Sequence, residues 1–180
     1  MSATHPDAGA DDGEALDPQE LGAYFMLMEA VSLLQHQVEQ QLRAEGDLSY
    51  VQFQLLARLA DAQGPLTMTQ LADGVVYSRS GLTYQAGLLE KAGLITRAPG
   101  RDDERATLVT ITEDGLALFG RVLPGHVRGV RRLLFDPMSG DDLHHLGDIM
   151  TRVRDHMRTQ PPRSAAPRKR RTPPEAPAAP

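Results

Sequence analysis

Apolar side chains recur every three or four positions along several long stretches of the chain, which is the spacing of one face of a helix. The first stretch follows Asp17-Pro18-Gln19-Glu20, which combines an N-cap, a proline at the first helical position and a capping-box acid. It predicts a helix of about 25 residues that ends before Gly46. Its expected buried face consists of Tyr24, Met28, Val31, Leu34, Val38 and Leu42. This length exceeds what one small core can cover, so we expect part of the face to meet another subunit.

Three shorter helices are expected next. Ser49 is an N-cap for a helix over about 50–62, which Gly64 and Pro65 terminate. A second capping box at Thr67 opens a short helix that extends to about Val75. After a brief turn, Ser78 caps a helix of about fifteen residues that closes at Gly93, where a glycine is favoured. Two short helices joined by a turn predict a helix-turn-helix.

A charged β-hairpin is expected directly after these helices. Residues 94–97 and 107–111 are rich in β-formers, and the nine residues between them, 98–106, include Gly100 and five charged side chains. Asp103 and Arg105 in this tip have a spacing that lets a carboxylate brace an arginine for a narrow minor groove. A hairpin in this place is the wing of a winged helix. A solvated hairpin tip is the alternative interpretation.

Two further helices complete the expected fold. Thr112 caps a helical segment that extends to about Phe135, and Ser139 caps the last helix, which ends before Pro161. The last helix has one apolar stripe, formed by Leu143, Leu146, Met150, Val153 and Met157. The predicted fold class is therefore mainly α with a small β-wing, a winged helix-turn-helix with long dimerisation helices.

The ends of the chain differ in composition from the middle. Residues 1–16 are acidic and show no periodicity, and residues 161–180 form a proline-rich basic tail, so we expect both ends to be disordered. The domain between them is expected to cover 17–160. Within it, the winged helix-turn-helix would occupy about 49–112, and the dimerisation helices about 17–45 and 112–160.

The fourth predicted helix is the candidate recognition helix. Leu82, Ala86 and Leu89 share one face that would pack inward, which leaves polar and small residues on the opposite face, where a recognition helix presents its N-terminal half to base edges. A surface helix with a polar exterior is the alternative. The residues predicted to contact DNA from this helix are Ser78, Arg79, Ser80, Gly81, Thr83, Tyr84 and Gln85. Those predicted from the wing are Arg97, Arg101, Asp103 and Arg105.

Charge and cysteine content narrow the function classes. The net charge of −5 requires that affinity for DNA come from locally placed arginines. The absence of cysteine excludes disulfides and thiolate metal sites, and no histidine has a partner at metal-ligand spacing, so neither a cofactor nor a metal is expected. The sequence shows neither a signal peptide nor an apolar stretch of membrane-spanning length, which predicts a cytoplasmic protein. No catalytic motif occurs, so an enzyme is not expected.

The order of these parts and three motifs together resemble the MarR family of winged-helix transcription regulators. The motifs are residues 78–83 (SRSGLT), residues 89–94 (LEKAGL), and DERA at 103–106 leading into VTITEDG at 109–115. The resemblance implies a cytoplasmic homodimer that binds double-stranded DNA at a pseudo-palindromic operator as a repressor and is released by a small, often aromatic, effector. Two positions depart from the family, which commonly carries arginines where this chain has Tyr84 and Leu88.

The resemblance also suggests where an effector would bind. In similar proteins the cleft lies where the first helices meet the DNA-binding lobe, and the candidates there are Phe25, Met28, His36, Tyr50 and Phe53. Plain core or dimer contacts are the alternative for each of these residues. A second function class also stays open, namely a winged-helix dimer that binds proteins and does not read DNA sequence.

Overall fold

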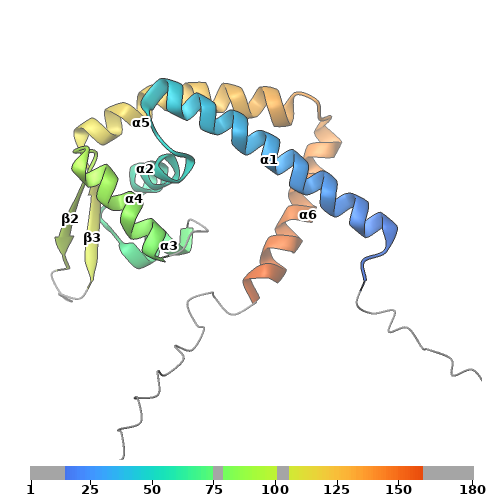
Figure 1. Cartoon of the computed structure of the whole chain (residues 1–180), viewed down its shortest axis with the longest axis horizontal. Helices are drawn as coiled ribbons and strands as arrows, with labels where there is room; N and C mark the ends of the chain where they lie inside the picture. The colour runs from blue at the N-terminus through green and yellow to red at the C-terminus, as the bar shows by residue number, and fades with distance from the viewer. Residues whose placement is uncertain (1–14, 75–78, 101–105, 160–180) are drawn as a thin grey trace, which may run out of the picture. The chain divides into compact units, whose positions relative to one another are not determined.

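The computed structural model describes residues 15–74, 79–100 and 106–159, and the chain folds as two compact units, 1–137 and 138–180 (Figure 1). The predicted tails lie almost entirely outside the described residues. The second unit holds α6 (Gly140–Thr159). The first unit holds α1 (Pro18–Gly46), α2 (Tyr50–Asp61), β1 (Leu66–Thr67), α3 (Met68–Gly74), α4 (Arg79–Lys91), β2 (Ile95–Pro99), β3 (Thr107–Ile111), α5 (Glu113–Val130) and a π-helical turn, η1 (Arg131–Phe135). The predicted fold class is confirmed.

The helix starts predicted at Asp17 and Ser49 are confirmed because capping is local chemistry, whereas Ser78 lies outside the described residues. The Asp17 carboxylate accepts hydrogen bonds from two backbone N–H groups of the first turn of α1, and the Glu20 carboxylate accepts one from Asp17 N at 3.0 Å. At α2, Ser49 and Gln52 form the same reciprocal pair. Each such pair satisfies backbone donors that a helix end leaves without partners.

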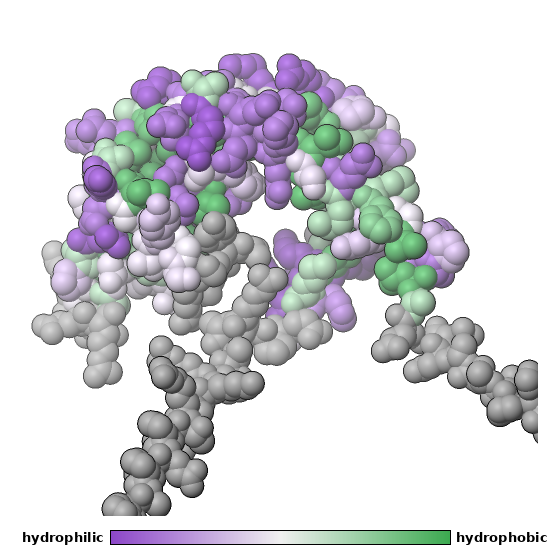
Figure 2. All heavy atoms as spheres, in the orientation of Figure 1, coloured by the Kyte–Doolittle hydropathy of each residue, from purple (hydrophilic) through white to green (hydrophobic). Residues whose placement is uncertain are grey.

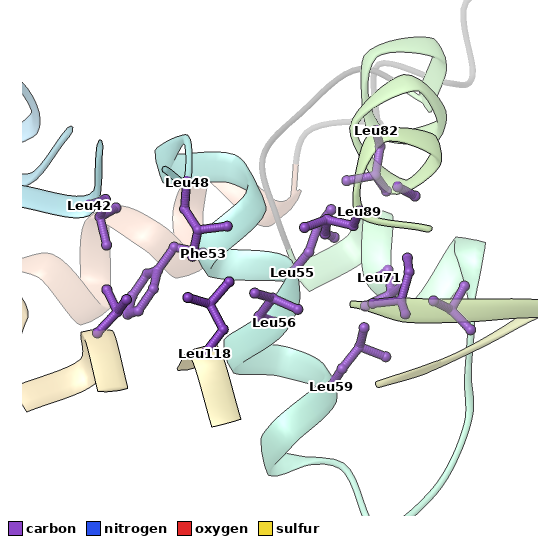
Figure 3. Packing of buried hydrophobic residues seen from close by; sticks show 14 of the residues in the cluster. Leu42, Leu48, Phe53, Leu55, Leu56, Leu59, Leu71, Leu82, Leu89 and Leu118 are labelled. Atoms are coloured by element: carbon purple, nitrogen blue, oxygen red, sulfur yellow. The ribbon is translucent and has the colours of Figure 1, made fainter. Parts of the chain in front are cut away.

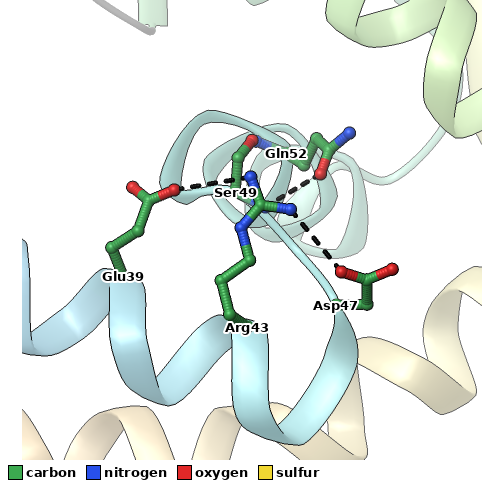
Figure 4. A network of polar contacts seen from close by, with 5 residues as sticks. All are labelled: Glu39, Arg43, Asp47, Ser49 and Gln52. Atoms are coloured by element: carbon green, nitrogen blue, oxygen red, sulfur yellow. Dashed lines mark hydrogen bonds and ion pairs between the residues drawn. The ribbon is translucent and has the colours of Figure 1, made fainter.

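The end of α1 differs from the prediction by one residue. Asp47 adopts the left-handed conformation, with φ of 50°, while Gly46 is still helical. The glycine is needed for packing instead, because a Cβ there would lie 2.7 Å from Cγ2 of Val122 on α5. Figure 4 shows the corner, where the Arg43 guanidinium lies 3.7 Å from the Glu39 carboxylate and 3.6 Å from that of Asp47.

The predicted wing is confirmed as an antiparallel hairpin, and a third strand joins it. In the order β1-β3-β2, Ile95 lies opposite Ile111 and Pro99 opposite Thr107. Gly100 N donates to Ala106 O at 2.7 Å, so the hairpin extends further than predicted and its tip is correspondingly shorter. β1, which the sequence did not predict, pairs with β3 and anchors the wing to the segment before α3.

The hydrophobic core is centred on α2, which contacts α1, α3, α4, α5 and β3 (Figure 3). Four of its side chains are buried, and they join apolar residues from every neighbouring element. A single core therefore fixes α4 and the wing relative to α1 and α5. The buried set is Val38, Leu42, Leu48, Phe53, Leu55, Leu56, Leu59, Leu71, Leu82, Ala86, Leu89, Ile95, Val109, Leu118 and Val122.

The apolar face of α1 is only partly covered within the chain, as expected from its length. Val38 and Leu42 are buried in the half that packs on α5, whereas Tyr24, Met28 and Val31 are exposed. In Figure 2 hydrophobic residues gather at the surface over the N-terminal half of α1. The face lacks a cover because the described part of this unit holds no element that packs on it.

The predicted stripe of α6 is also exposed within its own unit. Leu143, Met150, Val153 and Met157 are all exposed, and Leu146 is half-buried. These positions follow the spacing of one helix face. None of the described helices is long and apolar enough to cross a membrane.

Candidate nucleic-acid interface

The two faces of α4 differ as the sequence predicted. Leu82, Ala86 and Leu89 are buried against α2, α3 and β2. Ser80, Thr83 and Tyr84 are exposed on the other side. The helix is therefore held by one face and presents the other to whatever binds there.

The C-terminal end of α4 is tied tightly to the wing. Gly93 adopts a φ of 75°, and Leu94 N donates to Leu89 O at 3.0 Å, which closes the helix and turns the chain into β2. Thr112, at the far end of the hairpin, donates from its hydroxyl to Gly93 O at 2.7 Å and accepts from Gly115 N at 3.0 Å. One side chain thus joins the end of α4 to the start of α5.

Arg97, which the sequence predicted as a DNA contact of the wing, is bonded to a residue of α4. Its guanidinium is bonded to the Glu90 carboxylate of α4, with Nε donating to Oε2 at 2.9 Å. The arginine side chain is 28% exposed, so the pair is partly shielded from water. The hydrogen bond to Arg97 is the main cause that lowers the pKa of Glu90 below its ordinary value. The pair holds β2 against α4, and the predicted contact of Arg97 with DNA stays a prediction.

Several of the predicted DNA-contact residues lie in parts of the chain that the structure does not describe. Ser78, Arg101, Asp103 and Arg105 lie outside the described residues, as does the side chain of Arg79. Gly81 is half-buried at the start of α4.

Gln85 also lies near the packed side of α4 and not on its outer face. The residue is half-buried, and its Oε1 is buried without a hydrogen-bond partner among the described residues. The cause is its place in the helix, because position 85 lies one turn before the buried Leu89 and one position before the buried Ala86. Gln85 is therefore poorly placed to reach a base edge.

We expect Arg97→Gln to weaken specific DNA binding about two- to tenfold, the usual cost of ordering a free segment on binding. Glu90→Gln should weaken binding in the same direction, although removing a negative charge would by itself favour a polyanion. Fluorescence anisotropy with a labelled duplex measures both, and Arg121→Gln on the exposed surface of α5 controls for lost charge. Tighter binding by Glu90→Gln would show that the pair has no positioning role.

The five predicted effector residues do not line one cavity in a single copy of the chain, and an effector site at these residues stays a prediction. Phe53 is 4% exposed and belongs to the core, where its ring lies 4.5 Å from that of His126. Phe25 and Met28 lie on the uncovered part of α1. His36 is exposed and bonded to a glutamine of its own helix, and Tyr50 packs half-buried against the core.

A different groove, of about 480 Å³, lies between α1 and α5. Gln41 and His126 contribute polar atoms, Oε1 and Nδ1, that are buried without a hydrogen-bond partner among the described residues. Arg128 and Arg132 line the same groove, as does Glu45, whose carboxylate packs on Gly125. A concave site with unsatisfied polar atoms and charges of both signs is suited to a small polar ligand.

Burial lowers the pKa of His126 below its ordinary value of 6.5. The stability that neutral His126 contributes is therefore fully present above pH 6.5. It is lost as the pH falls from 6.5 toward the lowered pKa of the folded state. We expect the free energy of unfolding to fall between about pH 7.5 and pH 5.5, and to fall less in His126→Gln. Urea titrations at both pH values test this, with His36→Gln as the matched control; an unchanged pH response in His126→Gln would contradict it.

No group of three or more histidine, aspartate or glutamate side chains in the described ranges is arranged to hold a metal ion. The described residues present an outward-facing helix, α4, that is braced by a wing. A winged helix-turn-helix with this arrangement defines a class of DNA-binding proteins.

Comparison with known proteins places the chain within that class. The sequence profile of the MarR family matches residues 46–106. The regulator PecS of Dickeya dadantii is 31% identical over 71% of this chain and 77% of its own length. Two Streptomyces coelicolor structures are each 31% identical: Sco3205 in complex with DNA, with a TM-score of 0.77 over 82% of this chain and 96% of that one, and AbsC, with 0.76 over 81% and 99%. The chain belongs to the MarR family of DNA-binding transcriptional regulators.

Proposed function

We propose that this regulator is a homodimeric repressor that binds a pseudo-palindromic operator and is released by a small ligand. The observation that carries the proposal is the pair of uncovered apolar stripes, one on the N-terminal half of α1 and one on α6. Each stripe is long enough to need a partner helix, and a second copy of the chain supplies one more stripe of each kind. Closed two-fold symmetry is the commonest arrangement of such copies.

The dimer would place two α4 helices in successive major grooves on one face of the duplex, about one helical turn apart. Ser80, Thr83 and Tyr84 would face base edges, since they lie on the exposed side of α4. The N-terminus of α4 would face a phosphate. Arg105 of the wing would enter the adjoining minor groove.

Release by a ligand follows from how the parts are joined. The α1–α5 groove adjoins the core through His126, and α5 is tied to α4 and the wing through Thr112. A ligand held there would change the separation of the two α4 helices if it binds a misaligned state more tightly. A coupling of about 1 to 3 kcal/mol is typical of such linkage.

Size and duplex binding test the proposal together. We expect light scattering to give the mass of a dimer. The protein should bind tightly to a labelled duplex from the region upstream of its own gene, and Arg105→Ala should weaken that binding. The dimer should also block transcription in vitro from a promoter containing the site. A dimer that binds scrambled duplex equally well, with affinity that disappears in modest salt, would replace the repressor by the protein-interaction function.

A ligand screen addresses release separately. Thermal shift against small carboxylic acids and phenols identifies binders, and each binder is then added to the protein–duplex complex. We expect Gln41→Leu to abolish the shift by a binder of the α1–α5 groove. A binder that leaves duplex affinity unchanged at saturation is not an inducer by this route.

A further inference from the structure

Two side chains on the exposed face of α4, Tyr84 and Leu88, form an apolar ridge. Ser80, Tyr84 and Leu88 follow one another at intervals of four residues, which places them in a row along the helix. Tyr84 is 65% exposed and Leu88 is 38% exposed. Beside the row stands Gly87, where an added Cβ would meet only the tip of Arg97, at 3.9 Å. The ridge therefore stands clear of its neighbours.

Packing within the described residues does not account for these two side chains. Leu82, Ala86 and Leu89 fill the core from the opposite face of the same helix. A single exposed apolar residue needs no explanation, since much of any protein surface is apolar. Two neighbouring exposed apolar residues on the face that enters the DNA do need an explanation, because the walls of the major groove are mostly polar.

The major groove offers one kind of apolar group to such a ridge. Guanine, cytosine and adenine present hydrogen-bond donors and acceptors there, and thymine adds a C5-methyl group. We propose that Tyr84 and Leu88 recognise thymine methyl groups in each half of the operator. The inference rests on the proposed function, in which α4 enters the major groove. Residues four apart on a helix are about 6 Å apart along its axis, so the two methyls would lie about two base steps apart.

Deoxyuridine gives a direct test because it lacks only the methyl group of thymidine. Binding sites are first selected from a random-sequence duplex pool and footprinted, and thymines within the footprint are then replaced singly by uracil. We expect an affinity loss of about fourfold for each contacted methyl, the usual value for one buried carbon. At each position where uracil weakens binding, the base pair is then changed to cytosine opposite guanine. A duplex with 5-methylcytosine there should bind more tightly than the duplex with cytosine and so recover part of the loss. Uracil outside the footprint is the control and should have no effect.

Protein variants assign the effect to the ridge. Tyr84→Ala and Leu88→Ala should each lower the ratio of thymine affinity to uracil affinity toward one, each at a different thymine of the half-site. Tyr84→Phe, which keeps the ring, should retain the wild-type ratio. Leu116→Ala is the matched control, because Leu116 is apolar surface on α5 whose exposed fraction, 46%, lies between those of Leu88 and Tyr84. Unchanged thermal midpoints show that the variants fold.

The outcomes separate the inference from the proposed function. Selected sites that bind equally well with thymine or uracil would overturn the inference and leave the regulator intact. A discrimination that survives in both alanine variants would also overturn it, because other residues would then read the methyl. A pool that yields no enriched sequence would overturn both and favour a protein partner on this face.

Discussion

Val31→Asp is expected to convert the chain to a monomer and to lower its operator affinity by about a hundredfold or more. Val31 lies in the uncovered stripe of α1 with Tyr24 and Met28. A carboxylate buried in an apolar interface has no partner and would remain in water instead. Two linked reading sites gain about 100- to 10,000-fold over one, and a monomer forfeits that gain.

Ala30→Asp provides a matched control one residue away. Ala30 is exposed and lies outside the uncovered stripe, about 130° around the helix from the centre of the stripe. The control variant should remain dimeric and keep its affinity, since it introduces the same charge into the same helix. Sedimentation velocity and duplex binding measure both properties. A Val31→Asp chain that sediments as the wild type does would remove α1 from the interface.

Gly115→Ala is expected to destabilise the DNA-binding lobe by about 3 kcal/mol, at the upper end for overpacking. A Cβ at this buried position would overlap the carbonyl oxygen of Leu94 and approach Ile111 Cγ1 to 2.8 Å. Backbone atoms cannot yield as a flexible side chain can. The hydrogen bonds of Thr112 to Gly93 and Gly115 would be strained by any shift that relieves the overlap.

Gly120→Ala separates this clash from the general effect of a helical glycine. Gly120 lies in the same helix, with nothing within 4 Å of an added Cβ. It should gain about 0.5 to 1 kcal/mol, because alanine is the better helix former. Thermal denaturation should therefore move in opposite directions, by about 6 to 12 °C downward for Gly115→Ala. A rise in the midpoint of Gly115→Ala would contradict the packing described at Leu94.

The elements that the sequence predicted correctly are those set by neighbouring residues. Asp17, Ser49 and Ser139 each mark a helix start, because the side chain and the backbone donors that it caps are within three positions. The glycine at 93 ends α4 for an equally local reason, its positive φ. The alternation within 107–111 identified β3 because Val109 and Ile111 pack in the core while Thr110 between them is exposed.

Features that depend on distant residues were not predicted. β1 has only two residues, too few to show a period, and forms because β3 lies beside it. Gly46 is a contact with α5 and not a stop signal. Arg97 could not be paired with Glu90 from their separation in sequence, since the turn at Gly93 brings them together.

The candidate site was predicted in part. Helical spacing separated the buried Leu82 and Leu89 from the exposed Ser80 and Tyr84, because both sides belong to one helix. The length of the periodic stretch indicated that part of the α1 face lacks a cover within one chain, but the spacing alone could not show which half. It also could not locate a groove, because the groove depends on how two distant helices cross. The predicted effector residues were for that reason chosen without knowledge of any cavity.

The pairing of β1 with β3 constrains the order in which this lobe can fold. Leu66 and Val109 are partners, so the pairing closes a loop of about 40 residues that contains α3, α4 and β2. The recognition helix is an internal part of that loop and reaches its final place only when both ends meet. Contacts of such long sequence separation slow folding. The cost of a sheet that braces α4 is thus a slower search, during which a newly made chain exposes the apolar face of α4.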